Sequence, residues 1–128
     1  MSLRSPIGRV LGHGAAKEGV GHWWSQRVTS VALVFLSLWF VSALLRLDDL
    51  NYALVTTWLA KPLSAVLMTL LVATTVYHSQ LGLQVVVEDY VAGKGAKVVT
   101  LLLLKFLHVA LGALGIFAIL KIAFGASA

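Results

Sequence analysis

The chain has 128 residues, of which 59% are hydrophobic and 12% are charged, and its formal net charge is +5. Because a soluble domain carries about 25% charged residues, this composition excludes an ordinary water-soluble fold and predicts one domain whose surface mostly faces lipid. The sequence contains no cysteine, which excludes disulfides, iron–sulfur clusters and thiolate chemistry from this chain.

The N-terminal segment, residues 1–21, is predicted to be cytoplasmic, and its part from Gly8 onward is predicted to be irregular. It holds five glycines from Gly8 to Gly21, and no secretory signal peptide is expected in it. The first long apolar run follows, because 18 residues without a formal charge lie between Arg27 and Arg46. A membrane-spanning helix needs about 20 apolar residues, so we predict the first span at about residues 24–46.

The stretch between the first two spans has a different character. Residues 50–59 (LNYALVTTWL) are too few to cross a bilayer. Their aromatic residues, Tyr52 and Trp58, favour the headgroup region of a membrane. We therefore predict a short helix that lies at the interface.

The second and third spans complete the fold. The second is expected to begin at Pro62 and to end near residue 88, and Tyr77 and His78 are the only ionisable side chains in its run of 26 residues without a formal charge. The third is predicted at about residues 98–123, where Lys105 and Lys121 can reach the nearest interface. The sequence thus predicts an all-α membrane protein, with residues 22–128 forming a three-helix transmembrane anchor domain.

Basic residues predict the orientation of the three spans. The N-terminal segment is basic, and the connection between spans two and three carries Lys94 and Lys97. Three crossings place these regions on one side of the membrane, which the positive-inside rule makes cytoplasmic. In the first connection, Arg46 and Lys61 are balanced by two aspartates. The positive charge therefore indicates orientation in a membrane, and no nucleic-acid partner is expected.

His78 is the residue most indicative of chemistry. It lies roughly 15 Å, by helical rise, from the charged inner end of the second span, and so near the bilayer midplane. An ionisable residue at that depth is a functional-site hypothesis by default. Gly82 lies one turn on, on the same helical face as Val85 and Asp89, and leaves room for a large flat ligand. Histidine is a common axial ligand of haem iron, although a hydrogen bond to a neighbouring helix explains the same residue.

Two further polar residues have more ordinary explanations. His108 is followed by Gly112 and Gly115 on one helical face, a pattern more typical of close helix packing than of a cofactor site. Arg27 suits the start of a span that follows interfacial tryptophans. Alternatively, its guanidinium could bind a carboxylate, such as a haem propionate.

The second span ends in Glu88, Asp89 and Tyr90. Acids at a helix C-terminus are unfavourable with the helix dipole, so their presence calls for an explanation. The Tyr90 hydroxyl stands where a quinone headgroup could meet water, and Asp89 could orient it or relay a proton. A solvated turn with an interfacial tyrosine explains the same residues.

Taken together, residues 78–91 (HSQLGLQVVVEDYV) resemble the signature of the succinate dehydrogenase hydrophobic membrane anchor family, the cytochrome b-type anchors of respiratory complex II. That family has a histidine, a glycine four residues on, and Asp-Tyr eleven and twelve residues on, and all four positions match. Residues 21–29 (GHWWSQRVT) are similar to the lead into the first helix of bacterial members. The resemblance covers nearly the whole chain.

The resemblance implies specific roles for five residues. His78 would be one axial ligand of haem b, with Gly82 packing against the haem and Arg27 close to its propionates. Tyr90 would hydrogen-bond a ubiquinone carbonyl, with Asp89 as its acidic neighbour or proton relay. The second haem ligand would come from a sister membrane anchor, the cytochrome b membrane subunit.

The same resemblance implies a place in a larger enzyme. Succinate would be oxidised in a flavoprotein subunit, and electrons would reach quinone through an iron–sulfur subunit, so this chain would perform no succinate chemistry itself. The expected location is the bacterial cytoplasmic membrane, with the mitochondrial inner membrane as the alternative. His22 and His108 receive no role.

Two functions from other classes compete with this one. The chain could be a purely structural three-helix anchor without cofactor contact, in which His78 only joins two helices. It could also be a small transporter or channel subunit, although no internal repeat of the kind common in transporters is present.

Overall fold

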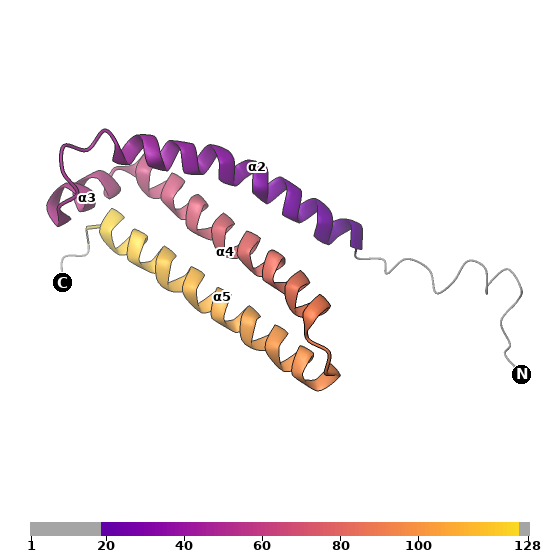
Figure 1. The fold of residues 1–128 in the computed structure, drawn as a ribbon. Helices are drawn as coiled ribbons and strands as arrows, with labels where there is room; N and C mark the ends of the chain where they lie inside the picture. Colours follow the sequence, from indigo (N-terminus) through magenta and orange to yellow (C-terminus); the bar gives the residue numbers. More distant parts are fainter. Residues whose placement is uncertain (1–18, 126–128) are drawn as a thin grey trace, which may run out of the picture.

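The computed structural model describes residues 19–125, which form four α-helices and no strand (Figure 1). Three of these helices are long and apolar enough to cross a membrane: α2 (Gly19–Leu44), α4 (Pro62–Tyr90) and α5 (Lys94–Ala123). The short helix α3 (Tyr52–Leu59) lies between the first two. The predicted all-α fold, with three spans and a short connecting helix, is confirmed. Most of the N-terminal segment predicted to be cytoplasmic lies outside the described residues, including Arg4, Arg9, His13 and Lys17.

Two predicted boundaries differ from the structure. Helix α2 begins at Gly19, so the last glycines of the segment expected to be irregular are helical. Helices in membranes tolerate glycine better than soluble ones, and these glycines therefore do not end the helix. Helix α5 begins at Lys94, before the predicted start of the third span near residue 98, with Gly93 as its N-cap and Gly95 already helical. The carbonyl of Gly93 accepts the first helical hydrogen bond, from the Lys97 amide at 2.8 Å.

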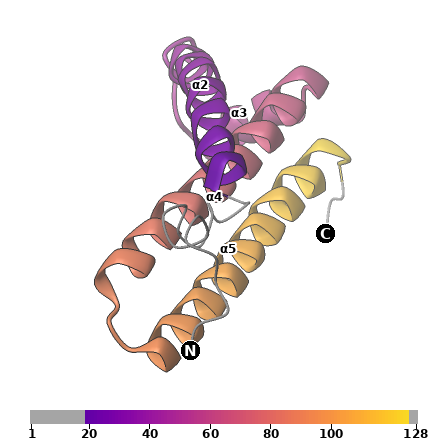
Figure 2. The ribbon, with the colours of Figure 1, turned by 90° about the vertical axis from the view of Figure 1, so that its right-hand side faces the viewer.

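Helix α4 occupies the centre of the bundle. It contacts both α2 and α5, which do not contact each other in the part of the chain described. Figure 2 shows α2 crossing α4 at an angle, whereas α4 and α5 run side by side. The start of α2 and the α4–α5 turn lie at one end (Figure 1), which we call the inner end, and α3 lies at the opposite, outer end. This arrangement is the one that three crossings require.

Small residues bring α4 and α5 close together, as the spacing in the sequence predicted. A Cβ atom added at Gly112 would lie 3.5 Å from Cγ1 of Val76, and one at Gly115 only 3.0 Å from Cγ1 of Val72. Without a hydrophobic driving force between helices in lipid, such close backbone approach supplies the packing energy. The glycines on α5 are therefore structural.

Replacing Gly115 by leucine is expected to lower the thermal stability of the detergent-solubilised protein, because α5 must move away from Val72. Overpacking of this kind costs about 1–3 kcal/mol. Gly95→Leu is the matched control, since nothing lies within 4 Å of a Cβ atom at Gly95. Thermal unfolding followed by circular dichroism measures both variants. Equal effects at the two positions would contradict the packing role.

The outer end is held by α3. The Asn51 side chain caps this helix by accepting a hydrogen bond from the Leu54 amide at 2.9 Å. Trp58 stacks on Trp39 of α2 with ring centroids 5.8 Å apart. A small core completes the contact with α4 and α5; its buried members are Leu59, Ala65 and Ile119.

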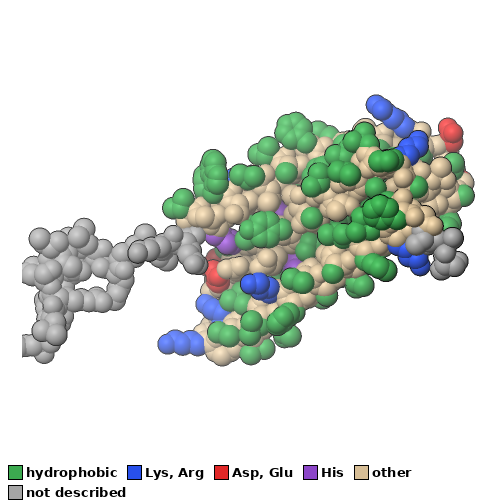
Figure 3. Space-filling view, turned by 180° about the vertical axis from the view of Figure 1, so that it is seen from behind, with side chains coloured by type: hydrophobic (Ala, Val, Ile, Leu, Met, Phe, Trp, Pro, Cys, Tyr) green, Lys and Arg blue, Asp and Glu red, His purple; other side chains and the backbone are tan. Residues whose placement is uncertain are grey.

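Little of the described chain is covered by the chain itself. Figure 3 shows hydrophobic side chains across the visible face, with charged side chains mostly towards its two ends. None of the residues in the most apolar 18-residue window of α2 is buried. Exposed apolar surface of this extent must meet lipid or another protein chain. The apolar surface of the three helices is therefore suited to a membrane.

Candidate functional site

His78 lies near the middle of α4, half-buried against α2. Its Nδ1 atom is 2.9 Å from Oγ1 of Thr29, and its Nε2 atom is 3.2 Å from Nε2 of Gln26. Both ring nitrogens therefore meet polar groups of the neighbouring helix. The sequence placed His78 near the bilayer midplane, and its position in a span of 29 residues agrees with that depth.

Gln26 fills the space next to the imidazole. A Cβ atom added at Gly82 would lie 3.6 Å from Nε2 of Gln26, the atom that also contacts His78. His78 and Gly82 thus share the face that looks toward α2, as their spacing predicted. The Oε1 atom of Gln26 is buried without a hydrogen-bond partner among the described residues. A flexible side chain with an unsatisfied oxygen is weakly held in this place.

Arg27 points elsewhere. Its guanidinium carbon lies 5.5 Å from the centre of the Trp23 ring, one turn earlier on α2, in a cation–π contact. The side chain is exposed. The structure does not bring Arg27 into contact with His78, although the adjacent Gln26 does contact it. The charge is therefore available to a group outside this chain.

Contacts of Glu88 partly explain why acidic residues are tolerated at the C-terminal end of α4. The carboxylate of Glu88 accepts a hydrogen bond from the Gln84 side chain at 2.8 Å. The ammonium of Lys97, in the first turn of α5, donates to the Glu88 backbone carbonyl. A basic side chain on a C-terminal carbonyl offsets the unfavourable position of the acids. Sequence reasoning did not foresee this contact.

Asp89 and Tyr90 remain open at the inner end. Both are exposed, and 84% of the Tyr90 surface is accessible. Tyr90 lies twelve residues beyond His78 on one helix, a separation of about 18 Å along its axis. The candidate residues therefore form two separate places, one within the span and one at its inner end.

The other two described histidines differ from His78. His108 is buried, and its Nδ1–H donates to the Leu104 carbonyl at 2.8 Å, while Nε2 accepts from the Ser79 hydroxyl at 3.2 Å. It joins α5 to α4, which agrees with the absence of a predicted role in chemistry. The Nε2 atom of His22 is buried and has no hydrogen-bond partner in the range that the structure covers.

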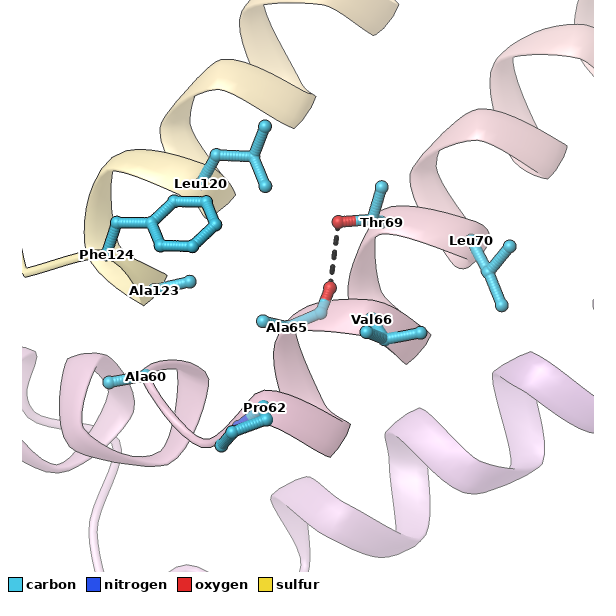
Figure 4. A pocket seen from close by; sticks show the side chains of 9 residues that line it. All are labelled: Ala60, Pro62, Ala65, Val66, Thr69, Leu70, Leu120, Ala123 and Phe124. Carbon is cyan, nitrogen blue, oxygen red and sulfur yellow. Dashed lines mark hydrogen bonds between the residues drawn. The ribbon is translucent and has the colours of Figure 1, made fainter.

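A separate groove lies at the outer end between α4 and α5. Its volume is about 370 Å³, and Leu120 of α5 and Phe124, the C-cap of that helix, face Pro62 and Thr69 of α4 across it (Figure 4). The lining contains no titratable side chain. Because the groove offers almost only apolar surface and comes no closer than eight residues to His78 along α4, at Leu70, it takes no part in the candidate redox site.

The small number of metal-binding side chains near His78 limits which kinds of metal site are possible there. No group of three or more metal-binding side chains occurs within residues 19–125. The residues that the structure describes therefore do not supply a full ligand set for a bare metal ion. A single histidine suits a metal whose other ligands come from a cofactor and a second protein chain.

Sequence reasoning missed the two residues that contact His78. Gln26 and Thr29 are spaced by three residues on α2 and so share one face. Both belong to the segment GHWWSQRVT, in which only Arg27 was singled out. The signal available was the pair of polar side chains inside the start of an apolar span.

Comparisons with known proteins agree on one family. Residues 1–120 match the family described as succinate dehydrogenase/fumarate reductase transmembrane subunit. A succinate dehydrogenase hydrophobic membrane anchor subunit from Rickettsia bellii (strain RML369-C) is 34% identical over 90 residues, which cover 70% of this chain and 72% of the relative. The protein of the same name from Rickettsia conorii (strain ATCC VR-613 / Malish 7) is 33% identical over 91 residues, covering 70% and 72% of the two chains. That from Paracoccus denitrificans is 28% identical over 93 residues, covering 73% and 72%.

Proposed function

This chain belongs to the family of succinate dehydrogenase/fumarate reductase transmembrane subunits, and we propose that it supplies one axial ligand of haem b and part of a ubiquinone-reduction site. It is a multi-pass membrane anchor within an oxidoreductase complex. Its task in that complex is to hold the redox groups at defined depths. The single observation that carries the proposal is His78, an imidazole near the centre of α4 with a glycine one turn away.

The residues around His78 fit a haem. Gly82 presents no Cβ atom, and the side chain over it is the flexible Gln26 carboxamide, whose Oε1 atom has no partner among the described residues. Displacing this carboxamide would open the Nε2 side of the imidazole, at the cost of one hydrogen bond worth about 0.5–1.5 kcal/mol. When bound, haem iron supplies a centre that exchanges one electron. His78 would hold it, and Gly82 would allow its ring to approach α4.

Arg27 would bind a haem propionate. Its guanidinium is exposed and rests on the ring of Trp23. Rotation about the side-chain bonds of Arg27 would bring its guanidinium to a propionate at the inner side of the haem. A planar guanidinium matches a carboxylate with two parallel hydrogen bonds.

Tyr90 and Asp89 would bind ubiquinone at the inner end of α4. A quinone arrives through lipid but takes up protons from water, so its site must border both phases. The Tyr90 hydroxyl is exposed where it can donate to a quinone carbonyl, and Asp89 next to it can pass a proton. Glu88 is already engaged by Gln84, which leaves Asp89 as the acid available for this role.

The proposed partner for the haem is a second membrane anchor, the cytochrome b membrane subunit. Helix α2 is hardly covered by this chain, and one histidine provides only one axial ligand. A partner packed on the α2–α4 face would cover apolar surface and provide the other ligand. The iron–sulfur and flavoprotein subunits would bind at the inner end. The relatives come from bacteria, which supports a place in the bacterial cytoplasmic membrane.

One observation favours a purely structural anchor as the second candidate. Both ring nitrogens of His78 have partners on α2, so the residue can join two helices without any cofactor. Such interhelical hydrogen bonds are worth about 0.6 kcal/mol on average in membranes. In this case the chain is still a membrane anchor, but it makes no contact with haem.

The deciding experiment purifies the complex through a tag on this chain and records its dithionite-reduced minus oxidised visible spectrum. We expect a b-type haem band together with a flavoprotein and an iron–sulfur protein. The same partners without haem would support the structural anchor. Absence of both would contradict the proposed complex.

A further inference from the structure

We propose that Thr29 is a positioning residue for the axial ligand. Its Oγ1 atom accepts a hydrogen bond from Nδ1–H of His78 and so fixes the tautomer that presents Nε2 to the iron. This inference rests on the proposed function, in which His78 binds haem. It adds a residue on a different helix, one that would never touch the haem.

The hydrogen-bond count at Thr29 supports this tautomer. The hydroxyl has one proton, and Oγ1 lies 2.7 Å from the Ser25 carbonyl oxygen, 3.1 Å from that of Gln26 and 2.9 Å from Nδ1 of His78. A carbonyl oxygen can only accept, so the hydroxyl proton goes to Ser25, the shortest of the three contacts. Oγ1 is then an acceptor toward His78, and Nδ1 carries the ring proton.

The contact of the other ring nitrogen, Nε2, supports the same tautomer of His78. Nε2 of His78 faces the amide nitrogen of Gln26 at 3.2 Å. With the carboxamide in this orientation, its nitrogen donates and Nε2 accepts, which agrees with the tautomer assigned from Thr29. A neutral imidazole with its proton on Nδ1 and its lone pair on Nε2 is the form that binds a metal through Nε2.

Thr29 is itself held in place. Its bond to Ser25, one turn back, fixes the side-chain rotamer on a rigid helix. The hydrogen bond to Nδ1 therefore sets both the tautomer and the plane of the imidazole ring. Partners of this kind orient metal-binding histidines and raise their basicity, and losing one typically costs about 10–100-fold in metal affinity.

The test compares Thr29→Val and Thr29→Ser in the whole complex. Valine keeps the shape of threonine but has no hydroxyl, whereas serine keeps the hydroxyl. Thr69→Val is the matched control, because Thr69 also bonds its own helix, at 2.8 Å to the Ala65 carbonyl, but lies at the outer groove. Two quantities are measured: the rate of haem transfer to apomyoglobin and the midpoint potential of the bound haem.

Thr29→Val is expected to weaken haem retention about 10–100-fold and to move the midpoint potential to more positive values. A less basic ligand stabilises the ferric iron less, which explains the direction. Thr29→Ser and Thr69→Val should stay close to the unmodified complex. The potential is measured per bound haem and so does not depend on how much complex assembles.

Unchanged potential and retention in Thr29→Val would overturn the inference. If His78→Ala loses haem in the same series, the proposed function stands and only the role of Thr29 fails. If His78→Ala keeps its haem, His78 is not the haem ligand, and the inference about Thr29 fails together with that part of the proposed function. Equal shifts in Thr29→Val and Thr69→Val would assign the effect to general loosening of the helices and would also overturn the inference.

Discussion

Replacing His78 by alanine is expected to remove most of the haem b from the purified complex while the anchor still inserts and assembles. The substitution removes the proposed axial ligand, and His108 cannot take its place, because it is buried between α4 and α5, away from the α2–α4 face that His78 occupies. The measurement is the haem absorbance of the tagged complex per mole of this subunit.

The control must account for lost interhelical hydrogen bonds. His78→Ala removes the contacts with Gln26 and Thr29, which together contribute about 1 kcal/mol in a membrane. His108→Ala removes a contact of the same kind, between α5 and Ser79. We expect His108→Ala to retain haem even if its thermal stability falls. If His78→Ala has a normal haem content, His78 only joins α2 to α4, and the ligand assignment is withdrawn.

Replacing Tyr90 by phenylalanine is expected to lower succinate–quinone reductase activity about tenfold while sparing the reduction of an artificial dye by succinate. The loss corresponds to one hydrogen bond to the reacting quinone, roughly 1.4 kcal/mol. The ring stays, and 84% of the side chain is exposed, so the fold should not change. Steady-state assays with a water-soluble ubiquinone analogue and with the dye measure the two activities.

Tyr52→Phe provides the matched control. Tyr52 is 84% exposed as well, but it lies on α3 at the outer end, away from the proposed quinone site. We expect this variant to keep both activities. If Tyr90→Phe lowers quinone and dye activities equally, the defect lies in assembly, and Tyr90 has no specific part in quinone binding.

The proposed haem site and the proposed quinone site lie on the same helix, α4. His78 lies within the membrane on α4, and Tyr90 lies about 18 Å further along the same helix at the inner end. A rigid helix keeps this separation fixed. The ammonium of Lys97 on α5 donates to the Glu88 carbonyl and fastens the end of α4 to α5, which would hold Asp89 and Tyr90 in place beside the incoming quinone.

Much of the fold could be predicted from the sequence because it depends on local properties. Three uncharged runs require three spanning helices, since backbone groups in lipid must be bonded within the helix itself. Pro62 begins α4 as expected, because its missing amide hydrogen costs nothing at the first position. The glycine spacing on α5 correctly indicated close packing.

The contacts of individual side chains could not be predicted in this way. Helices of a membrane protein are apolar on all sides, so the sequence has no amphipathic face that would show which side meets a neighbour. The segment around Arg27 did not reveal that Arg27 itself rests on Trp23, or that the adjacent Gln26 contacts His78. One position along a helix turns a side chain by about 100°, which decides between these outcomes.

The sequence by itself determined the three spans, the depth of His78 and the family signature in α4, because length, hydropathy and spacing are properties of one helix at a time. Only the tertiary structure decided that His78 faces α2, that Thr29 and Gln26 meet its two nitrogens, and that Lys97 contacts the end of α4. These contacts join residues 9 to 52 positions apart. They depend on how the helices pack, which the close approach at Gly112 and Gly115 and the crossing of α2 over α4 establish together.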